Sequence, residues 1–193
     1  HITNTKNFGI PVVVALNKFV SDTDAEIGLV KKLCSEYKTE AILCEGWEKG
    51  GKGATSLAEK VVSLCDEKSS FKYLYDESLS LKEKIETLAT KIYHAEYVEF
   101  DSKAEKKLKA YEEAGFGNLP ICMAKTQNSI SHDKACLGSP NGYPFPIRDV
   151  QLYSGAGFVV AFAGDIVDMP GLPKAPSALN IDVDDDGVIS GLF

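Results

Sequence analysis

Near the beginning of the chain, continuous apolar runs alternate with segments in which apolar residues recur at helical spacing. The run from Ile10 to Leu16 is rich in β-branched residues, as is typical of a strand buried in a parallel sheet. Apolar residues then recur at helical spacing, at Ile27, Val30, Cys34 and Tyr37. A second short apolar run, 41–44, leads to another helical pattern, at Leu57, Val61, Leu64 and Cys65. The order predicts a β-α-β-α unit with parallel strands covered by helices.

Polar residues mark where the predicted helices begin. Segments 23–26 and 56–59 have the Ser/Thr-x-x-Glu form of a capping box. Two further helices are predicted to begin at the Ser-x-x-Glu segments 80–83 and 102–105, and the second of them to end at Gly115. Additional strands are predicted at 119–124, 147–153 and 158–163.

These changes of pattern divide the chain into three parts. The predicted parts are a β-α-β-α segment over 1–68, an α+β region over 69–168 and a Pro/Gly-rich tail over 169–193 that wraps irregularly over the surface. The predicted fold class is α/β, with a parallel sheet in the first part. The chain begins at His1 rather than at a methionine, and we expect it to be a piece of a longer protein.

Composition narrows the class of function. A net charge of −7, with 44% hydrophobic and 25% charged residues, is ordinary for a soluble protein and argues against nucleic-acid or anionic-membrane partners. No apolar run approaches the roughly 20 residues that span a bilayer. Five cysteines without a C-x-x-C pair, and three dispersed histidines, favour buried reduced thiols in an intracellular protein over disulfides or a metal site.

The segment CEGWEKGGKGAT, residues 44–55, contains most of the phosphate-binding pattern G-x-x-x-x-G-K-[ST]. Gly53 stands where the pattern requires the Ser or Thr hydroxyl that binds Mg²⁺. Lys52 could still meet an anion, so a phosphate cradle and a plain strand-to-helix loop both stay open.

Three other motifs are incomplete. Asn17-Lys18 begins the guanine-reading N-K-x-D pattern, but Val20 replaces the acid. The acidic stretch 182–187 matches the front half of an EF-hand loop, but Phe193 occupies the closing position, so we expect a tight acidic turn. The pair Gly155-x-Gly157 lacks the third glycine of a dinucleotide loop.

Two aromatic residues follow the first two predicted strands. Phe19 and Trp47 each come just after a strand, and the carboxyl ends of neighbouring parallel strands meet at one edge of a sheet. Two aromatic faces there could hold a flat heterocycle by stacking, and Gly50, Gly51 and Gly53 would let the backbone approach it. Simple surface packing of the two rings is the alternative.

Five segments resemble formate–tetrahydrofolate ligase. They are FGIPVVVALNKFVSDTDAEI, WEKGGKGA, GFGNLPICMAKTQ, MPGLPKAP and the closing GLF, and together they cover the chain in the family's order. The match is to roughly the last third of that enzyme. The resemblance implies that the β-α-β-α unit belongs to a P-loop NTPase-like enzyme whose true P-loop lies upstream.

The resemblance also implies a reaction and a set of site residues. The family makes 10-formyltetrahydrofolate from formate, ATP with Mg²⁺ and tetrahydrofolate through formyl phosphate. By motif, the pterin-binding residues are Phe19, Trp47, Thr23, Gly50 and Gly51. Asn118 and Lys125 would border the nucleotide side, and no catalytic residue or metal ligand is expected in this segment.

Several further expectations rest on the resemblance alone. The full-length protein is expected to be a homo-oligomer, cytoplasmic or mitochondrial, with activation by a monovalent cation. The segment alone is expected to be inactive and to hold no tightly bound cofactor. Two alternatives are a P-loop-like nucleotide module that uses Lys52 and a non-catalytic interaction domain.

Overall fold

The computed structural model describes residues 1–164, 166 and 174–191. The first elements are α1 (Ile2–Lys6), β1 (Val13–Asn17), α2 (Asp24–Glu36), β2 (Glu40–Cys44), α3 (Gly46–Lys49), the 3₁₀ turn η1 (Gly50–Ala54) and α4 (Thr55–Cys65). The central elements are α5 (Leu81–Lys91), β3 (Tyr97–Phe100), α6 (Ser102–Glu113), β4 (Ile121–Ala124), β5 (Pro144–Ile147), β6 (Asp149–Tyr153) and β7 (Phe158–Phe162). The last are η2 (Ser177–Leu179), β8 (Asp182–Val183) and β9 (Ile189–Ser190).

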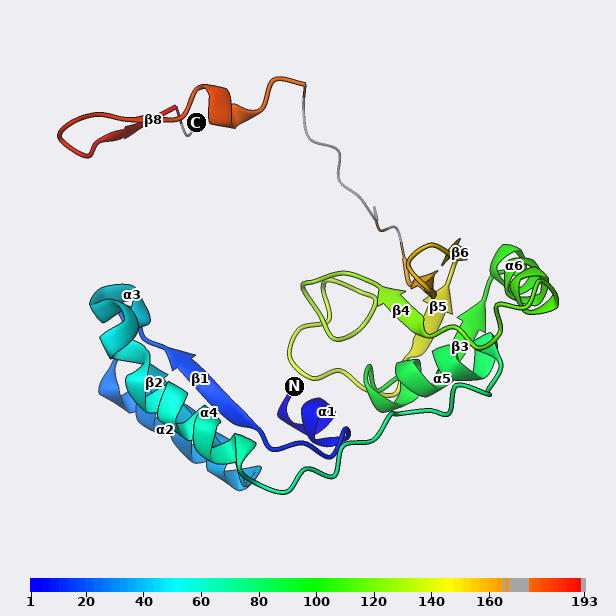
Figure 1. The fold of residues 1–193 in the computed structure, drawn as a ribbon, viewed down its shortest axis with the longest axis horizontal. Helices are drawn as coiled ribbons and strands as arrows, with labels where there is room; N and C mark the ends of the chain where they lie inside the picture. The colour runs from blue at the N-terminus through cyan, green and yellow to red at the C-terminus, as the bar shows by residue number, and fades with distance from the viewer. Residues whose placement is uncertain (165, 167–173, 192–193) are drawn as a thin grey trace.

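The first unit has the predicted β-α-β-α order. Strands β1 and β2 pair in parallel, from Val13 opposite Glu40 to Asn17 opposite Cys44. Helices α2 and α4 pack against this pair, and α3 lies at the end where both strands finish (Figure 1). The parallel pairing confirms the α/β class in its coarse form.

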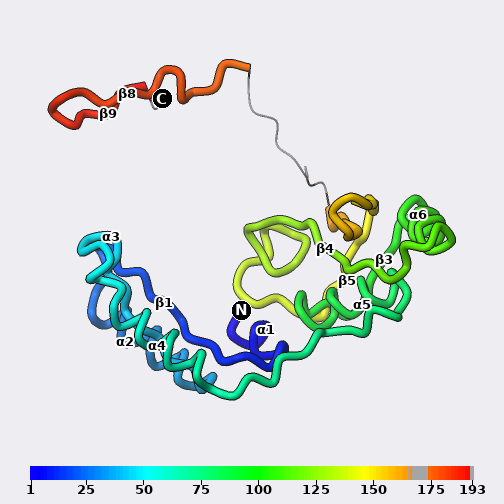
Figure 2. The backbone as a smooth tube through the Cα atoms, in the orientation of Figure 1, coloured from blue at the N-terminus to red at the C-terminus, as the bar shows by residue number. Residues whose placement is uncertain are grey.

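A second group of strands and helices forms the larger core. Strand β3 pairs with β5 in parallel, β4 pairs with β7 in parallel, and β6 pairs with β7 antiparallel. Helix α5 packs on β3 and β4, helix α6 packs on β6, and Figure 2 lets the reader follow the chain through this group. The fully buried side chains at its centre include Leu81, Ile85, Phe145, Ile147 and Val159.

Of the four Ser/Thr-x-x-Glu segments, two form complete capping boxes, and α4 and α6 begin without a side-chain cap. The Thr23 and Ser80 hydroxyls each accept a hydrogen bond from the backbone N–H three residues later, with both capping boxes complete, and α6 begins at Ser102 as predicted. The predicted box at 56–59 is wrong, because α4 begins at Thr55 and has no side-chain cap. The Thr55 hydroxyl instead donates to the carbonyl of Lys52 (3.1 Å), since the 3₁₀ turn runs directly into the helix.

Two strand boundaries differ from the prediction. The strand expected over 147–153 is divided at Arg148, because β5 pairs with β3 whereas β6 pairs with β7. Strand β3 was not predicted, and its short sequence, YVEF, lies between two helices. The end of α6 was predicted correctly: Gly115 has φ +89° and its N–H donates to the carbonyl of Glu112.

The cysteines are free thiols but they are not all buried. Cys34 is buried and Cys44 is partly buried, whereas Cys65, Cys122 and Cys136 are exposed. The expectation of buried thiols is therefore wrong for three of the five. A cysteine is a small apolar residue, and its spacing in a helix does not reveal which face will be covered.

The acidic stretch near the end of the chain forms a tight turn. It joins β8 to β9, and the Asp184 carboxylate accepts hydrogen bonds from the N–H groups of Asp186 (3.0 Å) and Val188 (2.8 Å). Within 174–191 the tail contains this hairpin and a 3₁₀ turn, so it is more regular than predicted, while 169–173 and 192–193 lie outside the described residues. Among the described residues, no helix has the length and apolar character needed to cross a membrane.

Candidate functional site

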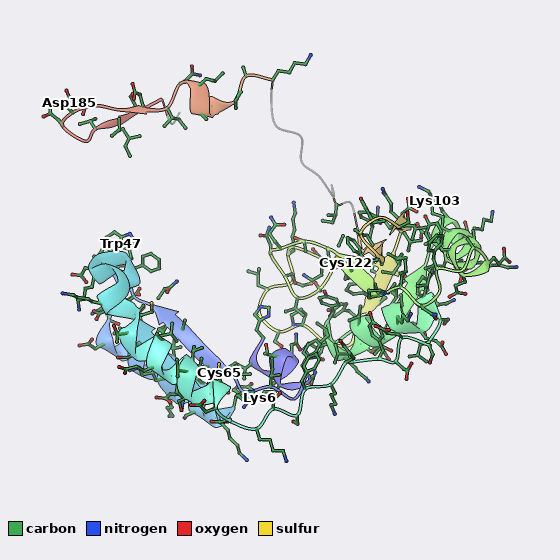
Figure 3. All side chains as sticks on the ribbon, in the orientation of Figure 1. Lys6, Trp47, Cys65, Lys103, Cys122 and Asp185 are labelled. Atoms are coloured by element: carbon green, nitrogen blue, oxygen red, sulfur yellow. The ribbon has the colours of Figure 1, made fainter. Side chains whose placement is uncertain are left out.

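The loops that follow β1 and β2 begin side by side. Asn17 pairs with Cys44 at the last rung of the two strands, and the Lys18 N–H donates to the Cys44 carbonyl (3.0 Å). Phe19 and Trp47 follow within three residues of that rung, with 54% and 71% of their surfaces exposed. Figure 3 shows Trp47 at the end of this unit that is opposite to Cys65. Both aromatic side chains therefore belong to loops at one edge of the sheet.

Glu45 connects the two loops. Its carboxylate lies 2.8 Å from the Lys49 ammonium and 3.6 Å from the Lys18 ammonium, and its N–H donates to the Gly53 carbonyl (3.0 Å). The hydrogen bond from Lys49 lowers the pKa of Glu45, and the same bond raises the pKa of Lys49. The carboxylate is thus held in its charged form between one lysine from each loop.

Different constraints act on the three glycines of the loop that follows β2. A β-carbon at Gly53 would lie 2.3 Å from the Glu45 carbonyl oxygen, so no side chain fits there without a shift of the backbone. Gly50 has φ +58° and ψ −145°, a conformation that other residues rarely adopt. At Gly51 neither reason applies, because its φ is not positive and an added β-carbon would meet no atom within 4 Å. Space next to Gly51 is therefore open.

The close approach at Gly53 explains the broken P-loop pattern. The Ser or Thr of a P-loop carries a β-carbon at this position, and here that atom would collide with the main chain of Glu45. The loop is built around contact between Glu45 and Gly53 rather than around a metal-binding hydroxyl.

Thr23 and Phe19 are held by local hydrogen bonds. The Thr23 hydroxyl donates to the Glu26 carboxylate (2.7 Å) and accepts from the Glu26 N–H (3.3 Å). The hydrogen bonds that the Thr23 hydroxyl and N–H donate to this carboxylate lower the pKa of Glu26. The Phe19 N–H donates to the Asp22 carboxylate (2.8 Å). The first loop is thus anchored on both sides, and the Thr23 hydroxyl is engaged in capping α2.

Lys52 belongs to the same loop as Trp47. It lines a cavity of about 730 Å³ that contains lysine and glutamate side chains in similar number: Lys31, Lys49, Lys60, Glu40, Glu45 and Glu59. Mixed charge of this kind does not concentrate positive potential as a phosphate cradle does.

The two residues expected on a nucleotide side are not neighbours. Asn118 is exposed in the turn before β4, and Lys125 follows the last residue of that strand. They therefore stand at opposite ends of β4. The Lys125 ammonium donates to the carbonyls of Thr126 (2.7 Å) and Ser129, and lies 5.5 Å from the centre of the Tyr93 ring.

Sequence reasoning missed the role of Glu45. The spacing of Glu45 and Lys49, four residues apart, is a readable signal for an ion pair on a helical turn. The second partner, Lys18, comes from the other loop and depends on the strand register, which no local pattern reveals.

Comparisons with known proteins place these residues in a family. The family model for formate–tetrahydrofolate ligase matches residues 1–193. Formate–tetrahydrofolate ligases from Staphylococcus aureus strains JH9, JH1 and Mu3 are each 50% identical to this chain over 193 residues, which is 100% of the chain and 35% of each relative. The chain thus spans about a third of the length of the curated relatives it matches. It belongs to the formate–tetrahydrofolate ligase family.

Proposed function

We propose that this chain is the C-terminal part of an ATP-dependent formate–tetrahydrofolate ligase and that it supplies the pterin-binding loops. The observation that carries the proposal is the exposure of Phe19 and Trp47 on loops that begin at the same rung of a parallel strand pair. Ligands of parallel-sheet proteins bind outside the carboxyl ends of the strands, which is where both residues lie. Family membership supplies the substrate, because tetrahydrofolate is a substrate named in the family's description.

The chemistry of a pterin fits this edge. A pterin is flat, polar along its rim and rich in π electrons on its faces, so aromatic side chains bind it by stacking with little loss of rotamer freedom. The open space beside Gly51 lets the ring approach the main chain. By analogy with stacking of nucleic-acid bases on aromatic residues, each ring contributes about 1–3 kcal/mol.

In the proposed reaction this segment and the rest of the enzyme have separate tasks. Formate attacks the terminal phosphorus of ATP, giving formyl phosphate and ADP. The N10 nitrogen of tetrahydrofolate then attacks the formyl carbon, phosphate leaves, and N10 loses its proton. The residues of this chain take no covalent part. They fix the pterin so that N10 meets the formyl group in the correct orientation, which is an entropic contribution to the rate.

Neither metal ion of the proposed reaction is assigned to this segment. Among the residues that the structure describes, no group of three or more His, Cys, Asp or Glu side chains is placed to hold a metal. We expect Mg²⁺ to arrive with ATP.

A Trp47→Ala variant of the full-length ligase tests the pterin site. We expect the KM for tetrahydrofolate to rise about ten-fold or more, with the KM for ATP nearly unchanged. Trp47→Phe keeps an aromatic face and should recover much of the affinity. Lys52→Ala is the matched control in the same loop, with little effect on either substrate. Loss of ATP affinity at Lys52, with tetrahydrofolate unaffected at Trp47, would establish the phosphate-cradle alternative instead.

The 193-residue chain by itself should not synthesise 10-formyltetrahydrofolate. The ATP-phosphate site is expected upstream, and Gly53 leaves no room for a P-loop hydroxyl here. Product formation is measured with formate, ATP and tetrahydrofolate in excess. Turnover of about 1 s⁻¹ or more, typical of a complete enzyme, would contradict the proposal.

Binding of neither folate nor nucleotide by the full-length protein would favour the non-catalytic interaction domain. Homo-oligomer formation and intracellular location stay predictions.

A further inference from the structure

The first unit, from β1 to α4, and the second region, from α5 to β7, are two bodies with contacts of their own. In the first unit α2 and α4 pack on β2, whereas in the second region α5 packs on β3 and β4 and α6 packs on β6. Figure 1 shows the first unit at the left and the second region at the right, with α1 between them. The chain passes between the two bodies twice, once from α1 to β1 and once from α4 to α5.

The two passages of the chain pair with one another in a short ribbon, formed by residues 8–9 and 70–72. The Ser70 N–H donates to the Gly9 carbonyl (3.2 Å), and the Lys72 N–H donates to the Phe8 carbonyl (3.0 Å). The Ser70 hydroxyl also donates to the Gly9 carbonyl (3.1 Å). Both connections between the bodies are therefore gathered at one place, which favours rotation about a single axis over independent motion of two linkers.

The ribbon is thin and exposed to solvent. Phe71 stacks on Phe8, with ring centroids 6.5 Å apart, but remains 54% exposed. Gly9 has φ +71°, and a β-carbon there would lie 2.3 Å from the Ser70 carbonyl oxygen, so the pairing requires glycine. Hinges are formed by a few loop residues that absorb changes in φ and ψ, and segments with few buried contacts are the ones that open most easily. The ribbon has both properties.

Helix α1 and the end of the second passage are fixed to the second region. Asn4 is 8% exposed, and its amide nitrogen donates to the Ile92 carbonyl at the end of α5 (2.8 Å). The Asn7 amide donates to the Lys91 carbonyl (3.3 Å), and the Lys91 ammonium donates to the Leu74 carbonyl (3.4 Å). On this side, both strands of the ribbon are therefore anchored to α5.

Lys6 connects this anchored helix to the first unit. Its ammonium donates to the carbonyls of Tyr37 and Lys38 (3.3 Å), where α2 ends. A cation is favoured at this place because the last carbonyls of a helix carry partial negative charge. Lys6 therefore forms a direct side-chain contact between the two bodies, next to the ribbon in the sequence.

We propose that the ribbon is a hinge between the first unit and the second region, and that Lys6 is a latch that limits its motion. While Lys6 holds the end of α2, the two bodies keep one orientation. When Lys6 releases α2, the first unit turns about the ribbon as a whole. Phe19 and Trp47 both belong to the first unit, so the turn carries them together and leaves their shared edge intact, whatever ligand it holds.

Distances between two spin labels in the full-length ligase test this hinge. A ketone-bearing amino acid that carries the label replaces Glu48 in α3 and Lys106 in α6, both exposed, so that every cysteine stays unchanged. Compared with wild type, Lys6→Met should widen the distribution of label distances at least about two-fold, because hinge motion displaces whole bodies. Lys6→Arg keeps the charge and should retain the wild-type width. Lys32→Met, on exposed α2, is the matched control and should cause no widening.

A second variant acts on the ribbon itself. Gly9→Ala should also widen the distribution, because the new β-carbon forces the paired segments apart. Gly138→Ala is its matched control, since Gly138 also has a positive φ (+78°) but an added β-carbon there would meet no atom within 4 Å. Melting temperature checks that each variant folds, and if Gly9→Ala does not fold, the Lys6 variants decide the question.

A label pair inside one body separates hinge motion from local unfolding. With labels at Glu48 and at Ser63 of α4, Lys6→Met should leave the distance distribution unchanged. The proposal is overturned if Lys6→Met leaves the Glu48–Lys106 distribution at its wild-type width, because other contacts then hold the bodies together. It is also overturned if the pair inside the first unit widens equally. Both results are distances, so they are independent of the KM values that test Trp47.

Discussion

The β1–β2 unit and the region from α5 to β7 bury their apolar side chains very differently. Of the 15 buried apolar residues among those described, 13 lie between Leu81 and Ala163, and only Cys34 and Ala41 belong to the first unit. In that unit, large apolar side chains on α2 and α4 are instead exposed, among them Leu29, Leu33 and Val62. Parallel sheets are normally covered on both faces, and two strands alone make a marginal sheet. We infer that the first unit is completed by further polypeptide, whereas the second region has a core of its own.

The largest expected effect tests that difference in burial. Phe145 is fully buried and stacks on Tyr93, so Phe145→Ala should lower the free energy of unfolding by about 3–5 kcal/mol. Val62 on α4 is 63% exposed, and Val62→Ala should change it by less than about 0.5 kcal/mol in this chain. Urea unfolding, followed by circular dichroism, would measure both changes in the free energy of unfolding. Equal losses would show that the two regions do not differ as described.

The Val62→Ala change can also test whether α4 is covered in the full-length ligase. If further polypeptide covers α4 in the full-length ligase, the same Val62→Ala change should cost about 1 kcal/mol there, because the lost methyl groups are then buried. An unchanged cost in the longer protein would show that α4 faces solvent in both.

A smaller effect is expected within the second aromatic loop. Gly53→Ala should destabilise the chain by about 1–3 kcal/mol, because the new β-carbon collides with the Glu45 carbonyl. Gly51→Ala adds the same methyl group into open space and should change stability by less than about 0.5 kcal/mol. In the full-length ligase, Gly51→Ala should nevertheless raise the KM for tetrahydrofolate, since the pterin needs that space. Thermal melts measure the stability effect and initial rates measure the KM. A stable Gly51→Ala enzyme with an unaltered KM for tetrahydrofolate would show that Gly51 does not contribute to the pterin site.

The smallest effect concerns an ion-pair cluster in the second region. Asp149 lies 2.7 Å from both Lys103 and Lys107 of α6, and so links that helix to β6. Burial raises the pKa of Asp149, but hydrogen bonds from Lys103, Lys107 and the Val150 N–H outweigh burial and bring it to about 2. We expect Asp149→Asn to cost about 1 kcal/mol at pH 7, after allowance for partial exposure.

The same pKa fixes how this cost depends on pH. A carboxyl group with a lowered folded-state pKa stabilises the fold above its unfolded pKa of about 3.9, and that contribution is lost as the pH falls toward about 2. The difference between wild type and Asp149→Asn should therefore shrink from pH 4 to pH 2. Glu113→Gln, which alters an exposed pair on the same helix, should show little effect at any pH. A constant difference for Asp149→Asn would mean that the carboxylate is not stabilised by its lysines.

The sequence predicted features that depend on neighbouring residues. The β-branched run before Asn17 and the Thr23 and Ser80 capping boxes follow from local sterics and hydrogen bonding, and the structure confirms them. The box at 56–59 failed because the conformation of the preceding glycines, which bring the chain into α4 through a 3₁₀ turn, overrides a four-residue pattern. Strand β3 was missed because its pairing partner, β5, lies more than 40 residues further along the chain.

The candidate site could be predicted only in part for the same reason. The strand-end positions of Phe19 and Trp47 can be read locally, and the structure confirms that the two strands before them end on one rung, Asn17 opposite Cys44. The role of the two aromatic residues with a pterin stays a prediction. The opposed positions of Asn118 and Lys125 follow from the length of β4, which the sequence indicates. The unpaired oxygen of Asn4 depends on packing against residues about 90 positions away, and no pattern in the sequence reveals it.

The position of Glu45 between the two loops has a consequence for how affinity responds to salt. Because one carboxylate pairs with both Lys18 and Lys49, we expect the loops carrying Phe19 and Trp47 to be restrained before any ligand arrives, which lowers the conformational entropy lost on binding. Dissolved ions screen exposed pairs of this kind. Raising the ionic strength should therefore loosen the loops and weaken binding even of an uncharged pterin, a ligand with no charge of its own for the ions to screen.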